Sequence, residues 1–162
     1  MQVQDREYKN GYERFVDNID GTVTDNFTKL MWLKDVNCIK TNYSTFDQDN
    51  QLSEIGDGLV QWRHALDFVK GINDGTYTLC GAGYTDWRLA NRWESQTTAQ
   101  VNNTRDPVKH PFINFPTISS VPHASWASTT YMEAKASAFC GGGGTDDKRA
   151  HNYLVWPVRG GQ

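Results

Sequence analysis

Long apolar runs and an excess of basic charge are both missing from this chain of 162 residues. No stretch approaches the roughly 18 apolar residues that a membrane helix needs, and a formal net charge of -3 gives no basic field to attract nucleic acid. We therefore expect neither membrane insertion nor a nucleic-acid partner. The polar start, residues 1–7, lacks the apolar core of a signal peptide, which leaves a cytosolic protein or the mature part of an exported one.

Closely spaced cysteines are missing as well. The three cysteines, Cys38, Cys80 and Cys140, form no Cys-x-x-Cys pair, which argues against a zinc ribbon or a thioredoxin-like redox motif. An odd count allows one bridge plus a free thiol, or three reduced thiols. A bridge would require an oxidising compartment.

Signatures of catalysis and of bound ions are also absent. The chain has no Gly-x-Ser-x-Gly elbow, and its glycine run at 141–144 lacks the Lys-Ser/Thr of a phosphate loop, so we interpret it as a flexible surface loop. The segment 17–21 resembles a calcium loop, but aligning Gly21 with the invariant glycine puts Val16 at the first ligand position. We expect no catalytic residue, no metal and no cofactor.

What the chain does have is aromatic side chains. They make up 12% of the residues and include six Trp, while hydrophobic residues are 38% and charged residues 22%. This composition is typical of a globular protein whose core is dominated by aromatic rings. Length and the lack of repeats or linkers predict one domain over 14–162 with an N-terminal extension at 1–13.

The first part of the chain indicates β-structure. Strands are predicted at 12–16 and 22–24, joined by a turn in which Gly21 adopts a positive φ, and a third strand at 29–34. The polar segment 37–58 is predicted to be a long surface loop.

The middle of the chain predicts two helices. Apolar residues within 62–72 recur at i, i+3, i+4 and i+7, and 73–75 ends that helix, with His64 off the apolar stripe and solvated. A second helix begins after Asn91 as N-cap, with Glu94 where a capping box places its acid. Strands at 125–131, 134–140 and 153–158 complete an α+β pattern.

These residues resemble a bacterial family named for the C-terminal domain of the Legionella collagen-like adhesin. Five ordered blocks carry the resemblance over nearly the whole chain: Arg-Phe-Val-Asp-Asn-x-Asp-Gly-Thr-Val-Thr-Asp at 14–25, Leu-Met-Trp at 30–32, Gly-Tyr-Thr-Asp-Trp-Arg-Leu-x-Asn at 83–91, Trp-x-Ser-Thr-Thr-Tyr at 126–131, and Val-Trp-Pro-Val-Arg-Gly-Gly at 155–161. The second predicted helix departs from the family because it lacks the usual apolar anchors.

The resemblance implies a C-type-lectin-like fold, with small twisted antiparallel sheets flanked by two helices, long loops, and pairing between the first and last strands. It also implies an extracytoplasmic location, secreted or at the cell surface. The adhesin that names the family is similar in binding sulfated polysaccharides as a trimer, so a homo-oligomer is a further implication.

A disulfide between Cys38 and Cys80 is implied by the same resemblance, which leaves Cys140, expected to be buried against the late strands. Arg88 and Arg159 are each expected to pair with an acid such as Asp86. The tryptophans of the shared blocks are expected in the core: Trp87, Trp126 and Trp156.

The function that this implies is non-enzymatic, calcium-independent binding of a glycan or protein ligand, because the calcium-dependent sugar motifs of true C-type lectins do not occur. Aromatic stacking and charge-assisted hydrogen bonds would then hold the ligand. The candidate ligand-binding residues are Arg92, Trp93, Arg105, Lys109, His110, His123, Lys135, Lys148, Arg149 and His151.

Two alternatives remain open. The chain could be a structural or oligomerisation domain of a surface protein. It could also be an oxidase or hydrolase on the same fold, in which Cys140 acts as a nucleophile beside His123 or His151.

Overall fold

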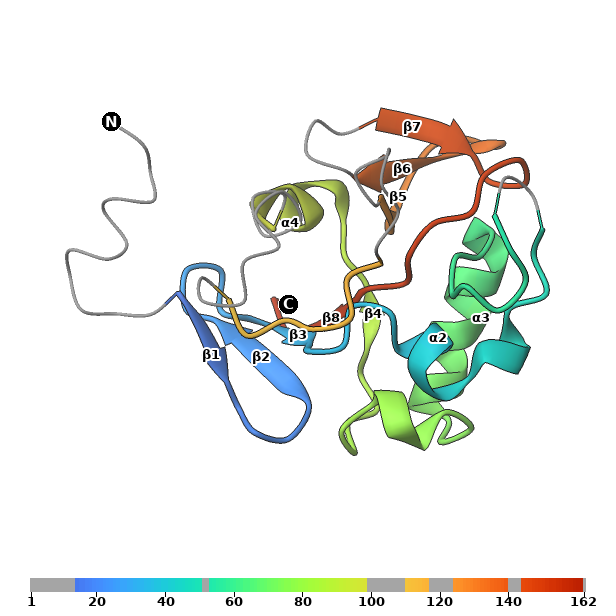
Figure 1. Ribbon diagram of the computed structural model, residues 1–162. Helices are drawn as coiled ribbons and strands as arrows, with labels where there is room; N and C mark the ends of the chain where they lie inside the picture. Colours follow the sequence, from blue (N-terminus) through green and yellow to red (C-terminus); the bar gives the residue numbers. More distant parts are fainter. Residues whose placement is uncertain (1–13, 51–52, 99–109, 117–123, 140–143, 162) are drawn as a thin grey trace.

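A computed structural model describes residues 14–50, 53–98, 110–116, 124–139 and 144–161 (Figure 1). It confirms the α+β class, with two antiparallel sheets of strand order β1-β2-β3-β8-β4 and β5-β6-β7. The strands are β1 Phe15–Asp17, β2 Thr22–Asp25, β3 Leu30–Leu33, β4 Arg88–Leu89, β5 Ser125–Met132, β6 Lys135–Phe139, β7 Gly144–Asp147 and β8 Pro157–Arg159. The helices are α2 Cys38–Asn42, α3 Trp62–Asn73 and α4 Arg92–Thr97, with short 3-10 helices η1 Ser44–Phe46 and η2 Thr78–Cys80.

The early hairpin has the predicted turn. β1 pairs with β2, and Gly21 adopts a φ of 93°, a conformation that glycine reaches without steric cost. β2 then pairs with β3, whose side chains Leu30, Trp32 and Leu33 are buried. A strand buried in this way is expected in the middle of a sheet.

The last strand lies beside β3, where Val158 is opposite Trp32, and β4 flanks its other side. The implied pairing of the first and last strands is therefore wrong: β1 is at the sheet edge, and β8 fills the place next to the buried β3. The predicted strand at 153–158 is also shorter than expected. Tyr153 and Leu154 form only single bridges, with Val60 and Ser125.

The polar segment 37–58 is not the long surface loop that its composition predicted. Asn37 caps α2 with its side chain, and Asp47 is fully buried. The Asp47 carboxylate accepts hydrogen bonds from the backbone N–H groups of Asp49 (3.0 Å) and Gly58 (2.9 Å). Burial raises the pKa of Asp47. The segment can fold inward because backbone N–H groups satisfy the hydrogen-bond acceptors of its buried polar side chains.

The disulfide and the tryptophan core agree with expectation. Cys38 of α2 and Cys80 of η2 are joined by a disulfide. Trp87, Trp126 and Trp156 are 3%, 0% and 1% exposed. The Trp156 Nε1–H donates to the Leu33 carbonyl at 2.9 Å, which satisfies the buried indole.

Both predicted helices are present. α3 buries Ala65, Phe68, Val69 and Ile72 on one face. α4 begins at the Asn91 capping box and buries Ser95, a small polar side chain in place of the usual apolar anchor. Within the described ranges, no helix has the length and apolar character needed to cross a membrane.

The glycine run is partly a strand rather than a loop. Gly144 and the next residue, Thr145, belong to β7 and lie opposite Ala138 and Ser137 of β6. Glycine fits there because the strand is short and at the edge of its sheet. Residues 141–143 lie outside the described part of the chain.

Candidate functional site

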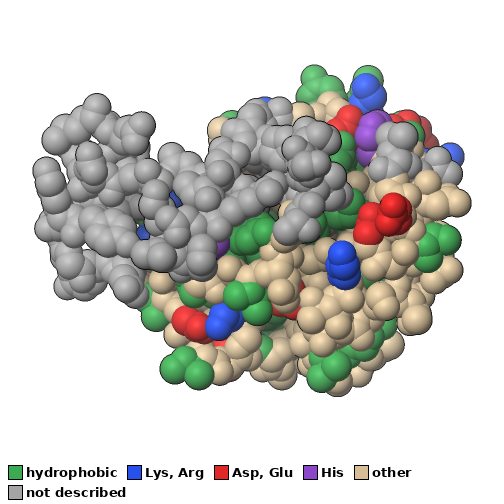
Figure 2. Space-filling view, viewed as in Figure 1, with side chains coloured by type: hydrophobic (Ala, Val, Ile, Leu, Met, Phe, Trp, Pro, Cys, Tyr) green, Lys and Arg blue, Asp and Glu red, His purple; other side chains and the backbone are tan. Residues whose placement is uncertain are grey.

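Four of the predicted ligand-binding residues lie together at one end of the second sheet. Lys135 begins β6 and lies opposite Asp147 of β7, and the Lys148 N–H donates to the Ala134 carbonyl at 3.0 Å. Figure 2 shows basic, acidic and histidine side chains gathered over this end of the sheet, beside hydrophobic ones. We call the β7-turn surface the set formed by Trp62, Glu133, Lys135, Asp146, Asp147, Lys148, Arg149, His151 and Tyr153.

Trp62 and Lys148 join α3 to this turn. Trp62 opens the helix, and its backbone N–H donates to the Lys148 carbonyl at 3.3 Å. Its indole Nε1–H donates to the Ala127 carbonyl at 2.9 Å, and the Lys148 ammonium lies 4.2 Å from the ring centroid. The same ammonium donates to the Glu133 carbonyl at 3.1 Å, so Lys148 is held in one position.

Asp146 links Tyr153 and His151. The Tyr153 hydroxyl donates to Asp146 Oδ2 at 2.6 Å, and His151 Nε2 lies 3.9 Å from Asp146 Oδ1. The rings of His151 and Tyr153 stack with an interplanar angle of 10°. The Trp126 ring packs edge-on against Tyr153 with a centroid distance of 4.8 Å, so the cluster rests on the core.

A tight turn presents Arg149 to solvent. Asp147 Oδ1 accepts hydrogen bonds from the backbone N–H groups of Arg149 (2.8 Å) and Ala150 (3.3 Å). The Arg149 N–H is the main cause of the lowered pKa of Asp147. Cations and carboxylates balance on this surface: Lys135, Lys148 and Arg149 against Glu133, Asp146 and Asp147.

Arg92 and Trp93 lie elsewhere, on α4. The Arg92 N–H donates to Thr129 Oγ1 of β5 at 3.0 Å, and its guanidinium lies 5.6 Å from the Trp93 ring centroid. Among the described residues, no hydrogen bond or ring contact joins either one to the β7-turn surface.

His110, predicted as a ligand-binding residue, is buried and not available to a ligand at the surface. It is 5% exposed, and its ring contacts Phe112 and Phe115 with centroid distances of 5.8 and 5.4 Å. Aromatic packing therefore accounts for its position. The remaining candidates lie outside the described residues: Arg105, Lys109, His123 and Cys140.

Five members of the β7-turn surface were not predicted from the sequence: Trp62, Glu133, Asp146, Asp147 and Tyr153. Trp62 fell on the apolar stripe of α3 and was assigned to the core, and Tyr153 was assigned to a closing strand. Asp146 follows the glycine run, which was interpreted as a surface loop, so strand β7 was not predicted there. The position of Trp62 at the first residue of the helix was the one available signal for a role near the surface, and the structure leaves its side chain partly exposed.

His64 is exposed on α3, as predicted, and it also has an acidic partner. Its Nδ1 lies 2.6 Å from Oδ2 of Asp49, which is itself buried. Asp49 Oδ2 also accepts the Gln61 N–H at 2.8 Å. This contact attaches the segment before α3 to the first turn of the helix.

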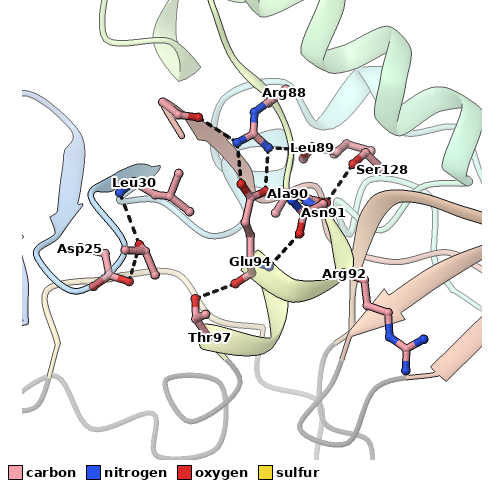
Figure 3. Close-up of polar contacts among 12 residues, drawn as sticks. Asp25, Leu30, Arg88, Leu89, Ala90, Asn91, Arg92, Glu94, Thr97 and Ser128 are labelled. Atoms are coloured by element: carbon pink, nitrogen blue, oxygen red, sulfur yellow. Dashed lines mark hydrogen bonds and ion pairs between the residues drawn. The ribbon is translucent and has the colours of Figure 1, made fainter. Parts of the chain in front are cut away.

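Arg88 and Arg159, which were each expected to pair with an acid, both form ion pairs. Arg159 pairs with Asp86 through Nε at 2.6 Å and Nη2 at 3.1 Å, as predicted, and this hydrogen bonding lowers the pKa of Asp86. Arg88 does not pair with Asp86. It binds Glu94 instead, as Figure 3 shows, because the capping box holds that carboxylate beside β4.

Metal-ligating side chains do not converge within the residues that the structure describes. No group of three His, Cys, Asp or Glu side chains there could hold a metal ion. The donors of the β7-turn surface are instead suited to hydrogen bonding, and its rings to stacking.

Comparison with known proteins identifies the family. No curated protein matches the chain. The model of the family described as the Lcl C-terminal domain matches residues 21–159, which include strands of both sheets, α2, α3 and α4. The chain therefore belongs to the Lcl C-terminal domain family.

Proposed function

We propose that this chain is the adhesin-like binding module of an exported protein, and that it binds a glycan at the β7-turn surface without calcium and without catalysis. Family membership supports an adhesin-like role. The observation that carries the choice of surface is the convergence of Lys135, Lys148, Arg149 and His151 with the rings of Trp62 and Tyr153.

A C-type-lectin-like fold is part of the proposal. Two small antiparallel sheets, two principal helices and a last strand that returns beside β3 support it. The Cys38–Cys80 bridge supports an extracytoplasmic location, because disulfides persist in oxidising compartments. Cell fractionation followed by immunodetection tests the location, and a purely cytosolic signal would contradict it.

The chemistry of the surface favours a hydroxyl-rich glycan over a densely sulfated polymer. Carboxylates accept hydrogen bonds from sugar hydroxyls, while Arg149 and Lys135 donate to ring and hydroxyl oxygens. Balanced charge provides no strong field for a polyanion. Weak salt dependence of binding is the expected signature.

A glycan array tests the proposal, followed by titration of the best glycan against variants. Arg149→Ala and Lys135→Ala remove exposed donors, and we expect each to weaken binding about tenfold, as loss of a charge-assisted hydrogen bond would. Lys40→Ala is the matched control, since Lys40 is an exposed cation on α2.

Two outcomes would overturn the proposal. If the folded wild-type protein binds no glycan on the array, a glycan ligand is excluded. Capture of a single protein from a host extract would then identify a protein ligand in its place. Binding that Arg149→Ala and Lys135→Ala leave unchanged moves the site away from the β7-turn surface.

A further inference from the structure

His151 is the only histidine of the β7-turn surface, and histidine is the side chain whose charge changes between about pH 8 and pH 5. Its ring stacks on Tyr153, and its Nε2 lies 3.9 Å from Asp146 Oδ1, too far for a hydrogen bond. The side chains of His151 and Asp146 are 33% and 36% exposed, so solvent reaches both. The surface therefore contains a titrating ring beside a carboxylate that it does not yet bind.

Gain of a proton changes what the His151 ring needs from its surroundings. Nδ1 is buried and has no hydrogen-bond partner among the described residues. In neutral imidazole the single proton can lie on Nε2, which leaves Nδ1 without a hydrogen. The charged ring carries an N–H on both nitrogens, and a buried N–H without an acceptor is costly. The ring is therefore expected to move when it becomes charged.

The charges around His151 determine the direction of that movement. Asp146 and Asp147 lie on β7, and both interact electrostatically with His151. In the turn, Lys148 is held on the Trp62 ring and Arg149 is exposed to solvent. The charged side chains at the start of α3 form ion pairs with other acids. A charged His151 is therefore attracted to β7, and first to the carboxylate of Asp146.

We propose that His151 is a proton-operated switch of the β7-turn surface, open to a glycan when the ring is neutral and closed onto Asp146 Oδ1 when it is protonated. This inference rests on the proposed glycan function. The Tyr153 hydroxyl already donates to Asp146 Oδ2, so Oδ1 is the oxygen that Asp146 can offer to a sugar hydroxyl. The imidazolium competes for Oδ1 because a hydrogen bond between two charged groups is stronger than one from a neutral hydroxyl.

Titration of the best glycan at about pH 7.5 and about pH 5.5 tests the proposal. We expect the wild type to bind about tenfold more weakly at the lower pH, as loss of one hydrogen bond to a charged acceptor would produce. His151→Asn cannot gain a charge, so its affinity should be the same at both pH values, whatever that affinity is. His151→Lys is charged at both pH values. Its affinity should also be independent of pH, but lower than that of His151→Asn.

His64→Asn is the matched control. His64 is also an exposed histidine beside an aspartate, but it lies on α3 and contacts Asp49. This variant should keep the pH dependence of the wild type. Loss of the pH dependence in His64→Asn would overturn the proposal and assign the switch to the contact with Asp49.

Nuclear magnetic resonance tests the closure without any ligand. The side-chain carboxyl carbon of Asp146 should shift over the same pH interval as the ring of His151, and the ring of Tyr153 should shift with them as the stack opens. Asp67 is an internal reference, because its carboxylate pairs with Arg63 on α3. Its carboxyl carbon should not follow His151.

The switch and the glycan proposal can fail separately. Glycan binding that Arg149→Ala weakens but pH leaves unchanged would overturn the switch and leave the glycan proposal standing. A pH dependence that persists in His151→Asn would also overturn the switch. If the glycan array is blank, the glycan proposal fails, and the resonance of Asp146 then decides whether the switch exists. A resonance that does not follow the ring of His151 overturns it.

Discussion

Arg88 and Glu94 form a two-pronged ion pair, with Nη1–Oε2 and Nη2–Oε1 distances of 2.7 Å each. Glu94 Oε2 also accepts the Asn91 N–H at 2.8 Å, and Arg88 Nη2 donates to the Gly160 carbonyl at 2.8 Å. Strand β4, the start of α4 and the C-terminal segment are thus joined by two side chains (Figure 3). Burial acts to raise the pKa of Glu94, but the hydrogen bonds from Arg88 and Asn91 outweigh it, and the pKa is lowered.

Glu94→Gln is expected to lower the free energy of unfolding by about 2 kcal/mol at pH 7, because it leaves Arg88 partly buried without its counter-charge, while the glutamine can still accept the Asn91 N–H of the capping box. The folded pKa lies below the value of about 4.3 for an unfolded glutamate. The stabilisation is therefore fully present above that pH and is lost as the pH falls through the folded pKa. Urea unfolding of both proteins at pH 7 and pH 3 measures this, with Gln96→Ala on the same helix as control. A deficit that persists unchanged at pH 3 would contradict the ion-pair account.

The sequence predicted half of this arrangement. Asn91 and Glu94 are three residues apart, so local helix geometry alone brings them together, and the capping box was predictable. The partner of Arg88 was not. Asp86 is closer in sequence, but its carboxylate binds Arg159, which depends on how β8 pairs with the strands on either side of it.

The candidate site was predictable in the same partial way. The basic residues after β7 are close together in the sequence, which was enough to predict a cluster. Trp62 reaches it only through contacts with Ala127 and Lys148, far away in the sequence. Local periodicity contains no information on such contacts, which the tertiary fold determines.

The Cys38–Cys80 bridge closes a loop with a sequence separation of 42. Constraint of the unfolded chain by such a loop is expected to contribute roughly 3 to 4 kcal/mol. Cys38→Ser with Cys80→Ser should lower the urea midpoint accordingly. Under denaturing conditions without reductant, the wild type should take up one alkyl group, at Cys140, and three after reduction. Three alkyl groups without reductant would show that the bridge is not formed.

Gly58 is a backbone position where a side chain does not fit. Its φ is 84°, and a Cβ there would collide with the side-chain amide of Asn37. That amide cannot easily move, because it caps α2 and donates to the Asp57 carbonyl at 2.9 Å. Gly58→Ala is therefore expected to destabilise the fold by more than about 2 kcal/mol.

Gly75→Ala is the control for this clash. Gly75 has the same φ of 84°, with nothing within 4 Å of the added Cβ, so its substitution should cost only about 1 kcal/mol for the backbone conformation. Thermal or urea unfolding of both variants isolates the difference. Equal losses of stability in the two variants would mean that the Asn37 side chain moves aside at little cost and does not hold the 37–58 segment in place.

Ile19, at the tip of the first hairpin, has a φ of 64° and is 91% exposed. A β-branched residue is strained in this left-handed conformation, and so exposed a side chain recovers little by burial. Ile19→Asn should therefore stabilise the protein by about 0.5 to 1 kcal/mol, since asparagine tolerates the conformation. Ile19→Val keeps the branched Cβ and should change little. If differential scanning calorimetry found Ile19→Asn no more stable than Ile19→Val, the hairpin tip would not store strain, and the Ile19 N–H bond to Asp17 Oδ1 at 2.9 Å would suffice to hold the turn.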